Sequence, residues 1–158
     1  MRWEFQKSLH SMMERDERTF LIFGDVGLSL FKSHIADFPK RVLNFGLAEQ
    51  SMISFAAGMA MRGFRPICYS ILPFMLERAF EQIKIDVDQM KLPVGIVGHS
   101  DSSCGPTHEE VCAGTMMALL PNIEKHFPAT IAGMKTMMNN VNLDAPWFVK
   151  LSTVKEGA

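Results

Sequence analysis

The chain has 158 residues, of which 47% are hydrophobic and 21% are charged, and its formal net charge is -1. These values are typical of a globular protein with a sizeable core, and we expect residues 1–158 to form one domain. Because Lys and Arg form no run and no apolar stretch reaches about 20 residues, neither nucleic acid nor a membrane is an expected partner. The N-terminus lacks the apolar stretch of a signal peptide.

Cysteine and methionine usage gives two further indications. The three cysteines, Cys68, Cys104 and Cys112, have no C-x-x-C spacing, which favours a reduced, cytoplasmic protein. The 13 methionines fit either flexible filling of the core or a surface buried against a partner. Neither interpretation assigns a chemistry.

Along the chain, apolar residues alternate between helical spacing and short continuous runs. In chain order, the pattern predicts a helix at residues 3–14, strands at 19–23 and 42–43, a helix at 48–62, a strand at 67–70, a helix at 74–90, a strand at 94–98, helices at 111–119 and 129–140, and a strand at 147–151. The helix at 48–62 is apolar on most sides and is expected to be buried. Strands that alternate with helices predict a three-layer α/β domain, with a mostly parallel sheet covered by helices on both faces.

Polar clusters follow three of the predicted strands, with GDVG at 24–27, NFG at 44–46 and GHSD at 98–101. In parallel α/β sheets, ligands bind in the crevice beyond the carboxyl ends of the strands. Asp25, in the first cluster, is therefore a candidate cofactor-binding residue.

Glu49 stands at the start of the apolar helix that follows Gly46. A glutamate in a first helical turn has an ordinary structural explanation, because it complements the helix dipole. Since the next dozen residues are nearly all apolar, we nevertheless expect this carboxylate to be buried, where it needs a partner. The residues alone leave both a structural and a functional role open.

His108, in the run G-P-T-H, lies on a loop beyond the strand at 94–98. Its imidazole is suited to binding, to proton transfer or to capping a turn. Cys104, His108 and Cys112 have the spacing of one helix face, which raises the alternative of a zinc site. Pro106 disfavours that helix and no fourth ligand is evident, so we expect no metal site in this chain.

Three motifs occur in the order G-L-A-E-Q at 46–50, R-A-F-E-Q-I at 78–83 and G-P-T-H at 105–108. With them the chain resembles the pyrimidine-binding domain of transketolases, from Arg2 to about Leu151. It is most similar to the separate C-terminal subunits of split transketolases, and more distantly similar to 1-deoxyxylulose-5-phosphate synthase and the beta subunit of pyruvate dehydrogenase. The resemblance implies the pyrimidine module of the thiamine diphosphate (ThDP)-binding fold.

The resemblance also implies roles for individual residues. Glu49 would hydrogen-bond N1′ of the cofactor's aminopyrimidine and promote the proton transfer that activates the cofactor. Phe74 would pack on the pyrimidine ring, but Tyr69 and Met75 are alternatives, and Phe74 would equally suit a helix core. His108 would contact the substrate beside the thiazolium. The other substrate-binding candidates are His99 and, as donors to a sugar phosphate, Ser29 and Arg2.

Cys104 departs from the family pattern, in which an acidic residue usually precedes G-P-T-H and contacts a donor hydroxyl. A thiol is a poor acceptor for a hydroxyl, so Cys104 is a candidate substrate-binding residue that changes donor or acceptor choice. The I-E-D that often follows the histidine is also replaced, by Val111-Cys112-Ala113. Both departures bring standard pentose-phosphate transketolase activity into question.

In this family a second domain holds the diphosphate and Mg²⁺ through a G-D-G motif and a later Asn, and GDVG at 24–27 is not that motif. The resemblance thus implies a separate diphosphate-binding subunit that carries Mg²⁺, with ThDP shared between the two chains. Self-association of the pyrimidine domains would make a heterotetramer.

The function expected from the sequence is that of the pyrimidine-binding subunit of a two-component, transketolase-like transferase. With its partner, it would move a ketol unit between sugars or sugar derivatives. Two alternatives remain open. One is a component of a 2-oxo acid decarboxylase or dehydrogenase, which G-P-T-H disfavours, and the other is a non-catalytic remnant that binds a partner.

Overall fold

The computed structural model describes residues 1–101, 104–109 and 112–152, and the six strands in this part of the chain form one sheet in the order β2-β1-β3-β4-β6-β5. Neighbouring strands are parallel throughout, so the sheet that the sequence predicts to be mostly parallel is entirely so in the described residues. The strands are β1 (Thr19–Phe23), β2 (Val42–Asn44), β3 (Arg65–Ile71), β4 (Gly95–His99), β5 (Glu124–His126) and β6 (Trp147–Leu151).

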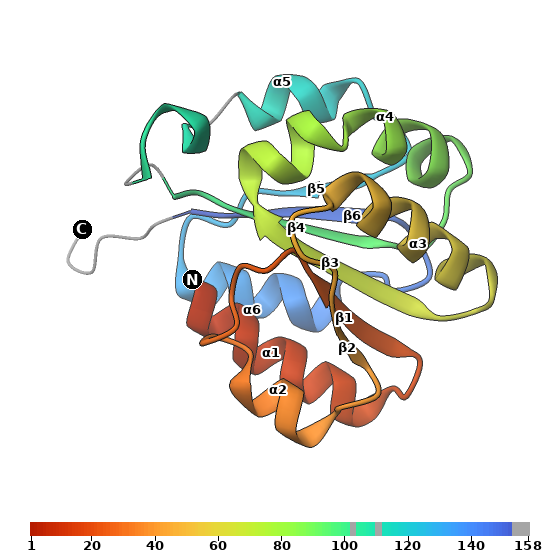
Figure 1. Cartoon of the computed structure of the whole chain (residues 1–158), viewed down its shortest axis with the longest axis vertical. Coiled ribbons are helices and arrows are strands. Elements are labelled where there is room, and N and C mark those ends of the chain that lie inside the picture. Colours follow the sequence, from red (N-terminus) through yellow and green to blue (C-terminus); the bar gives the residue numbers. More distant parts are fainter. Residues whose placement is uncertain (102–103, 110–111, 153–158) are drawn as a thin grey trace.

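Helices cover both faces of this sheet (Figure 1). One face carries α1 (Arg2–Arg15), α2 (Lys32–Asp37) and α6 (Ile131–Asn140), and the other carries α3 (Glu49–Met61), the helical segment at 74–89 and α5 (Ala113–Ala118). The three-layer α/β fold predicted from the sequence is therefore confirmed. Within the residues described, no helix has the length and apolar character needed to cross a membrane.

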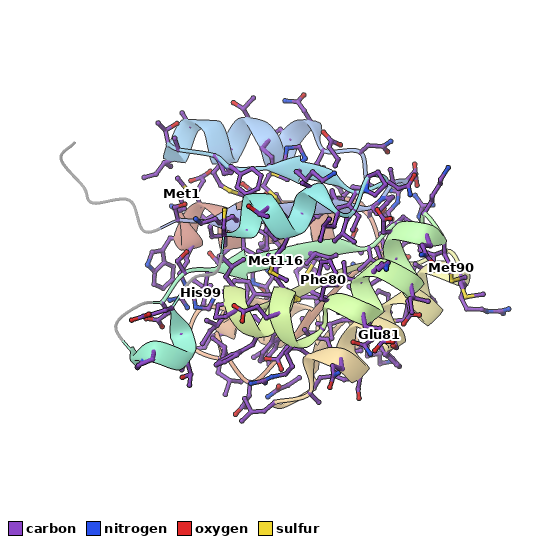
Figure 2. The ribbon with its side chains drawn as sticks, turned by 90° about the horizontal axis from the view of Figure 1, so that it is seen from above. Met1, Phe80, Glu81, Met90, His99 and Met116 are labelled. Atoms are coloured by element: carbon purple, nitrogen blue, oxygen red, sulfur yellow. The ribbon has the colours of Figure 1, made fainter. Side chains whose placement is uncertain are left out.

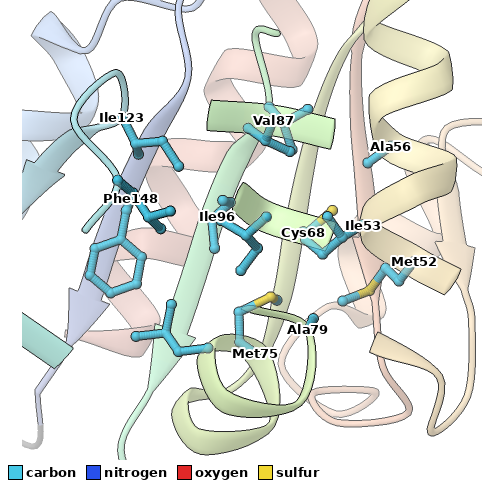
Figure 3. Close-up of a cluster of buried hydrophobic side chains, with 14 of the residues drawn as sticks. Met52, Ile53, Ala56, Cys68, Met75, Ala79, Val87, Ile96, Ile123 and Phe148 are labelled. Carbon is cyan, nitrogen blue, oxygen red and sulfur yellow. The ribbon is translucent and has the colours of Figure 1, made fainter. Parts of the chain in front are cut away.

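Two hydrophobic clusters lie on opposite faces of the sheet, because successive side chains of a strand point to opposite faces. In β3, Cys68 belongs to the cluster beneath α3, shown in Figure 3, whereas Ile67 and Tyr69 belong to the cluster beneath α1 and α6. Cys68 is fully buried, and burial raises the pKa of its thiol. The same alternation directs Tyr69 to the α1 side and Ser70 to the α3 side at the end of this strand.

The long helix predicted at 74–90 is present as a helical segment, but it is not one continuous α-helix. The segment consists of two π-helical parts, η1 (Phe74–Arg78) and η2 (Ile83–Gln89), on either side of a short α4 (Phe80–Gln82). Its buried side chains are Met75, Leu76, Ala79, Ile83, Val87 and Asp88, so one side of the segment faces the core. A π turn closes i to i+5 hydrogen bonds and is wider than an α turn, so the segment departs from regular α-helical geometry while it keeps a buried face.

The helix predicted at 48–62 forms α3 but is buried on one face only. Met52, Ile53 and Ala56 face the sheet with no exposed surface, whereas Phe55 and Met61 expose 44% and 63% of theirs. The expectation of a buried helix is therefore correct for the sheet side and wrong for the outer side. The sequence pattern does not predict α2 and β5, which have six and three residues and are too short for a clear period.

Candidate functional site

The carboxyl ends of β1, β3 and β4 meet at one edge of the sheet, where the loops that follow them carry the candidate residues. Gly24, directly after β1, makes a close approach there. A Cβ atom at this position would lie 3.2 Å from the Gly46 carbonyl oxygen and 3.3 Å from Glu49 Oε1. Glycine therefore allows the loop after β1 to close against the carboxylate of Glu49.

Glu49, the first residue of α3, has no exposed surface, which confirms its expected burial. Both carboxylate oxygens accept hydrogen bonds. The Ser70 hydroxyl donates to Oε1 at 2.9 Å, and Nη1 of Arg78 donates to Oε2 at 2.7 Å. These two donors are the partners that a buried carboxylate needs.

Phe74 and His108 lie beside this ion pair. The Arg78 guanidinium lies over the Phe74 ring, 4.3 Å from its centroid, and His108 meets the same ring edge-on with centroids 4.9 Å apart. His108 closes a 3₁₀ turn, η4 (Pro106–His108), which follows Gly105 in a left-handed conformation with φ 92°. The structure thus brings together Glu49, Phe74 and His108, which the sequence presents as separate candidates.

The two alternatives to Phe74 are less accessible. Tyr69 and Met75 have no exposed surface, whereas the Phe74 side chain is half-buried. A planar ligand at this edge would therefore meet Phe74 first.

A second group of side chains lies on the α1 side of the same edge. Nε of Arg2 donates to the Tyr69 hydroxyl at 3.0 Å, and the Tyr69 ring is stacked on His99 with centroids 5.1 Å apart. Nδ1 of His99 lies 3.1 Å from the Ser70 carbonyl oxygen. Since a carbonyl only accepts, Nδ1 carries the proton, and Nε2 is buried with no hydrogen-bond partner in the part of the chain that the structure describes.

Burial sets the charge state of this group. It lowers the pKa of His99 to about 4, with a further contribution from the positive charge of Arg2. Burial also raises the pKa of Tyr69 to about 12. Both rings are therefore neutral near pH 7, and the charge in this group belongs to Arg2.

Arg2 and Ser29 line one pocket of about 310 Å³ beside this group, together with Met1, Trp3, Leu30, Ser100, Leu151 and Ser152. Figure 2 shows Met1 and His99 at the same end of the molecule, opposite to Met90. The two residues expected to donate to a sugar phosphate therefore share a cavity.

Asp25 and Cys104 occupy more exposed positions. Asp25 has a left-handed backbone with φ 57°, its N–H donates to Asn44 Oδ1 at 3.0 Å, and Nδ2 of Asn44 donates back to Asp25 Oδ1 at 3.2 Å. This exchange fastens the loop after β1 to the end of β2. Cys104 is exposed and directly precedes Gly105. No group of three His, Cys, Asp or Glu side chains suited to a metal ion occurs among the residues that the structure describes.

The sequence does not indicate Arg78 and Ser70 as residues of this site, and it presents Tyr69 only as an alternative to Phe74. Arg78 lies inside the R-A-F-E-Q-I motif, but nothing in the pattern indicates that it pairs with Glu49. Ser70 and Tyr69 are neighbours at the end of a predicted strand, and the alternation of strand side chains would have placed them on opposite sides.

A parallel α/β sheet with polar side chains gathered at its carboxyl edge is the arrangement in which such domains bind ligands. Residues 1–152 match the family described as "Transketolase, pyrimidine binding domain", and the chain belongs to this family. The resemblance drawn from the three motifs is thereby confirmed.

Three similar proteins illustrate the range of this family. The chain is 36% identical over 145 residues to 1-deoxy-D-xylulose-5-phosphate synthase 1, chloroplastic, of Oryza sativa subsp. japonica, which covers 85% of this chain and 19% of that protein. It is 31% identical over 128 residues to an uncharacterized 33.6 kDa protein in the fasciation locus of Rhodococcoides fascians, covering 78% and 41%. A solved structure described as "Split gene transketolase, inactive beta4 tetramer" matches with a TM-score of 0.83 and 26% identity, covering 96% of this chain and 50% of that one. The chain therefore spans half or less of each of these proteins.

Proposed function

We propose that this chain is the pyrimidine-binding subunit of a two-component, ThDP-dependent transketolase-like enzyme that transfers a ketol unit between sugars or sugar derivatives. The observation that carries the proposal is the fully buried carboxylate of Glu49 beside the half-buried ring of Phe74, within a domain of the transketolase pyrimidine-binding family.

The residues at this edge fit the aminopyrimidine of ThDP. Glu49 offers a carboxylate that would hold a hydrogen bond at N1′, and Phe74 offers an aromatic face for the ring. Ser70 would keep the carboxylate in place through Oε1. When bound, ThDP supplies the carbon nucleophile and the electron sink that ketol transfer requires.

The substrate would extend from His108 toward the pocket that contains Arg2 and Ser29. The guanidinium of Arg2 and the Ser29 hydroxyl are suitable donors for a phosphate. His99 is neutral with Nδ1 protonated, and its Nε2 would accept a hydrogen bond from a sugar hydroxyl once substrate binding exposes this buried atom. Cys104 and Asp25 border the same edge and complete the set of proposed binding residues.

A separate subunit would hold the diphosphate and Mg²⁺. The proposal is supported by the match of residues 1–152 to the pyrimidine-binding domain and by the similarity to a split gene transketolase. That relative is described as a beta4 tetramer, which supports self-association of such chains. We propose a heterotetramer with two ThDP sites at the unlike interfaces, to which the outer face of α3 with Phe55 and Met61 would contribute.

Co-expression with a diphosphate-domain protein tests this proposal. Light scattering of the co-purified pair should give the mass of two copies of each chain. The pair should transfer a ketol unit from a ketose phosphate to an aldose phosphate only when ThDP and Mg²⁺ are present. A chain that stays monomeric and binds no such partner would favour the non-catalytic alternative.

A second candidate activity follows from one comparison. The 36% identity to a 1-deoxy-D-xylulose-5-phosphate synthase favours a synthase that makes a 1-deoxy sugar phosphate. Pyruvate as the donor in the same assay distinguishes the two, because only the synthase would release carbon dioxide.

A further inference from the structure

We propose that Arg78 occupies the pyrimidine site of this chain until the cofactor displaces it, because one guanidinium contacts both groups that would hold the aminopyrimidine. This inference rests on the proposed function. It adds an internal competitor that lowers the affinity for the cofactor.

The contacts of Arg78 are those that a bound aminopyrimidine would need. Nη1 donates to Glu49 Oε2 at 2.7 Å, and the guanidinium carbon lies 4.3 Å from the centroid of Phe74. Ser70 already donates to Glu49 Oε1. Both oxygens of the carboxylate and one face of the ring are therefore engaged.

The chemistry of the two groups explains how one can replace the other. A guanidinium is planar and positively charged, and it donates N–H groups in its plane to a carboxylate while it stacks on aromatic faces. An aminopyrimidine protonated at N1′ is also planar and charged, with an N–H donor in the ring plane. Glu49 and Phe74 are complementary to both.

Arg78 is able to leave the site, whereas Glu49 is not. The side chain of Arg78 is 41% exposed and that of Glu49 is 0% exposed. A long side chain that is partly exposed exchanges protein contacts for water at little cost, but a buried carboxylate that loses its cation is strongly destabilised. Release of Arg78 is therefore favourable only when another N–H donor reaches Glu49.

The competing explanation is that Arg78 stays in place and only positions Glu49. The two explanations predict opposite effects of removing the guanidinium. A competitor raises the apparent Kd by the inverse of the fraction of time that the site is free, whereas a positioning residue lowers the Kd.

Thiamine, which carries the aminopyrimidine without the diphosphate, is the probe for the full chain. Its thiazole half, 4-methyl-5-thiazoleethanol, is the control ligand. The side-chain N–H signals of Arg78 in ¹⁵N NMR spectra should be those of a held guanidinium in the free chain. They should move to the values of a solvated arginine as thiamine is added, and they should not respond to the thiazole.

Affinity gives the second readout. If Arg78 covers the site about nine-tenths of the time, Arg78→Met should strengthen thiamine binding about tenfold. Arg62→Met, at the exposed end of α3, is the matched control and should leave the affinity unchanged. Circular dichroism and thermal melting verify that both variants are folded.

Three results would overturn the inference. These are weaker thiamine binding by Arg78→Met, Arg78 signals that stay unchanged at saturating thiamine, and no thiamine binding by any variant. The first two leave the proposed function intact, because thiamine still binds. In the third case, ThDP-dependent turnover of the co-purified pair decides separately whether the proposed function also fails.

Discussion

The two halves of the candidate site manage charge in opposite ways. On the α3 side, Glu49 keeps a carboxylate without exposed surface and pairs it with Ser70 and the partly exposed Arg78. On the α1 side, burial and the charge of Arg2 lower the pKa of His99 to about 4, so the stacked rings remain neutral. The α3 side pairs a buried charge with a cation, whereas the α1 side keeps its buried rings neutral. The two halves should therefore fail under different perturbations.

The largest effect is expected from Glu49→Gln. An amide still accepts from Ser70 and has nearly the same size, so the fold should persist, but it cannot exchange a proton with N1′. Turnover of the complex with its partner should fall by about 10²- to 10⁴-fold. Initial rates measured with ThDP and Mg²⁺ check this. Glu77→Gln, on the exposed side of η1, is the control that should keep its activity, and near-normal rates for the Glu49 variant would refute the catalytic assignment.

Acid should act on the opposite half of the site and on the α1–α2 contact. Burial is the main cause that lowers the pKa from 6.5 to about 4 for both His99 and His34, and both side chains have no exposed surface. Between pH 6.5 and pH 4 each of these histidines is protonated in the unfolded chain but neutral in the folded chain. Stability is therefore fully present above pH 6.5 and falls as the pH drops toward 4, by up to about 1.4 kcal/mol per pH unit for each histidine.

Urea unfolding at several pH values between 7 and 4.5 measures this slope. His99→Gln and His34→Gln should each flatten it, whatever their effect on stability at pH 7. A slope that both variants leave unchanged would contradict the assignment of these two histidines as the titrating groups.

A smaller effect is expected from Tyr69→Phe, which removes the hydroxyl that accepts from Arg2 but keeps the ring stack. The lost hydrogen bond should lower stability by about 1 kcal/mol. Because Arg2 loses its anchor, the KM for a phosphorylated donor should rise while the affinity for ThDP stays the same. A donor without phosphate serves as the control, since its KM should not change. Equal changes for both donors would show that the two halves are not separable.

A comparably small effect is expected from Cys104→Asp. A carboxylate accepts a hydrogen bond from a donor hydroxyl, so kcat/KM should shift roughly fivefold toward ordinary ketose phosphates, the equivalent of ~1 kcal/mol. Cys104→Ser is the control of similar size and should shift selectivity less. One tightly held zinc per chain, lost in the Ser variant, would instead support the zinc alternative.

The sequence predicts the framework of this molecule better than its contacts. Regular runs such as Thr19–Phe23 and Trp147–Leu151 define their strands to the residue, because buried parallel strands are continuous apolar segments. The burial of Glu49 also follows from its apolar surroundings. The partner of that carboxylate does not, since Arg78 lies 29 residues away and only the tertiary fold brings it near.

The two π-helical parts of the segment at 74–89 show a second kind of limit. Apolar residues at every fourth position look like an ordinary amphipathic helix in the sequence. The local pattern is the same for an α turn and for a π turn, so it does not indicate which of the two forms. The local sequence therefore gives the element and its buried face but not its hydrogen-bonding period.

Both outermost strands of the sheet, β2 and β5, are only three residues long. A short edge offers few open N–H and C=O groups, which is how natural sheets avoid recruiting another chain by strand addition. Copies of this protein are thus discouraged from joining edge to edge into fibres or extended sheets. We therefore expect any assembly to use helix surfaces and loops, where side-chain shape selects the partner.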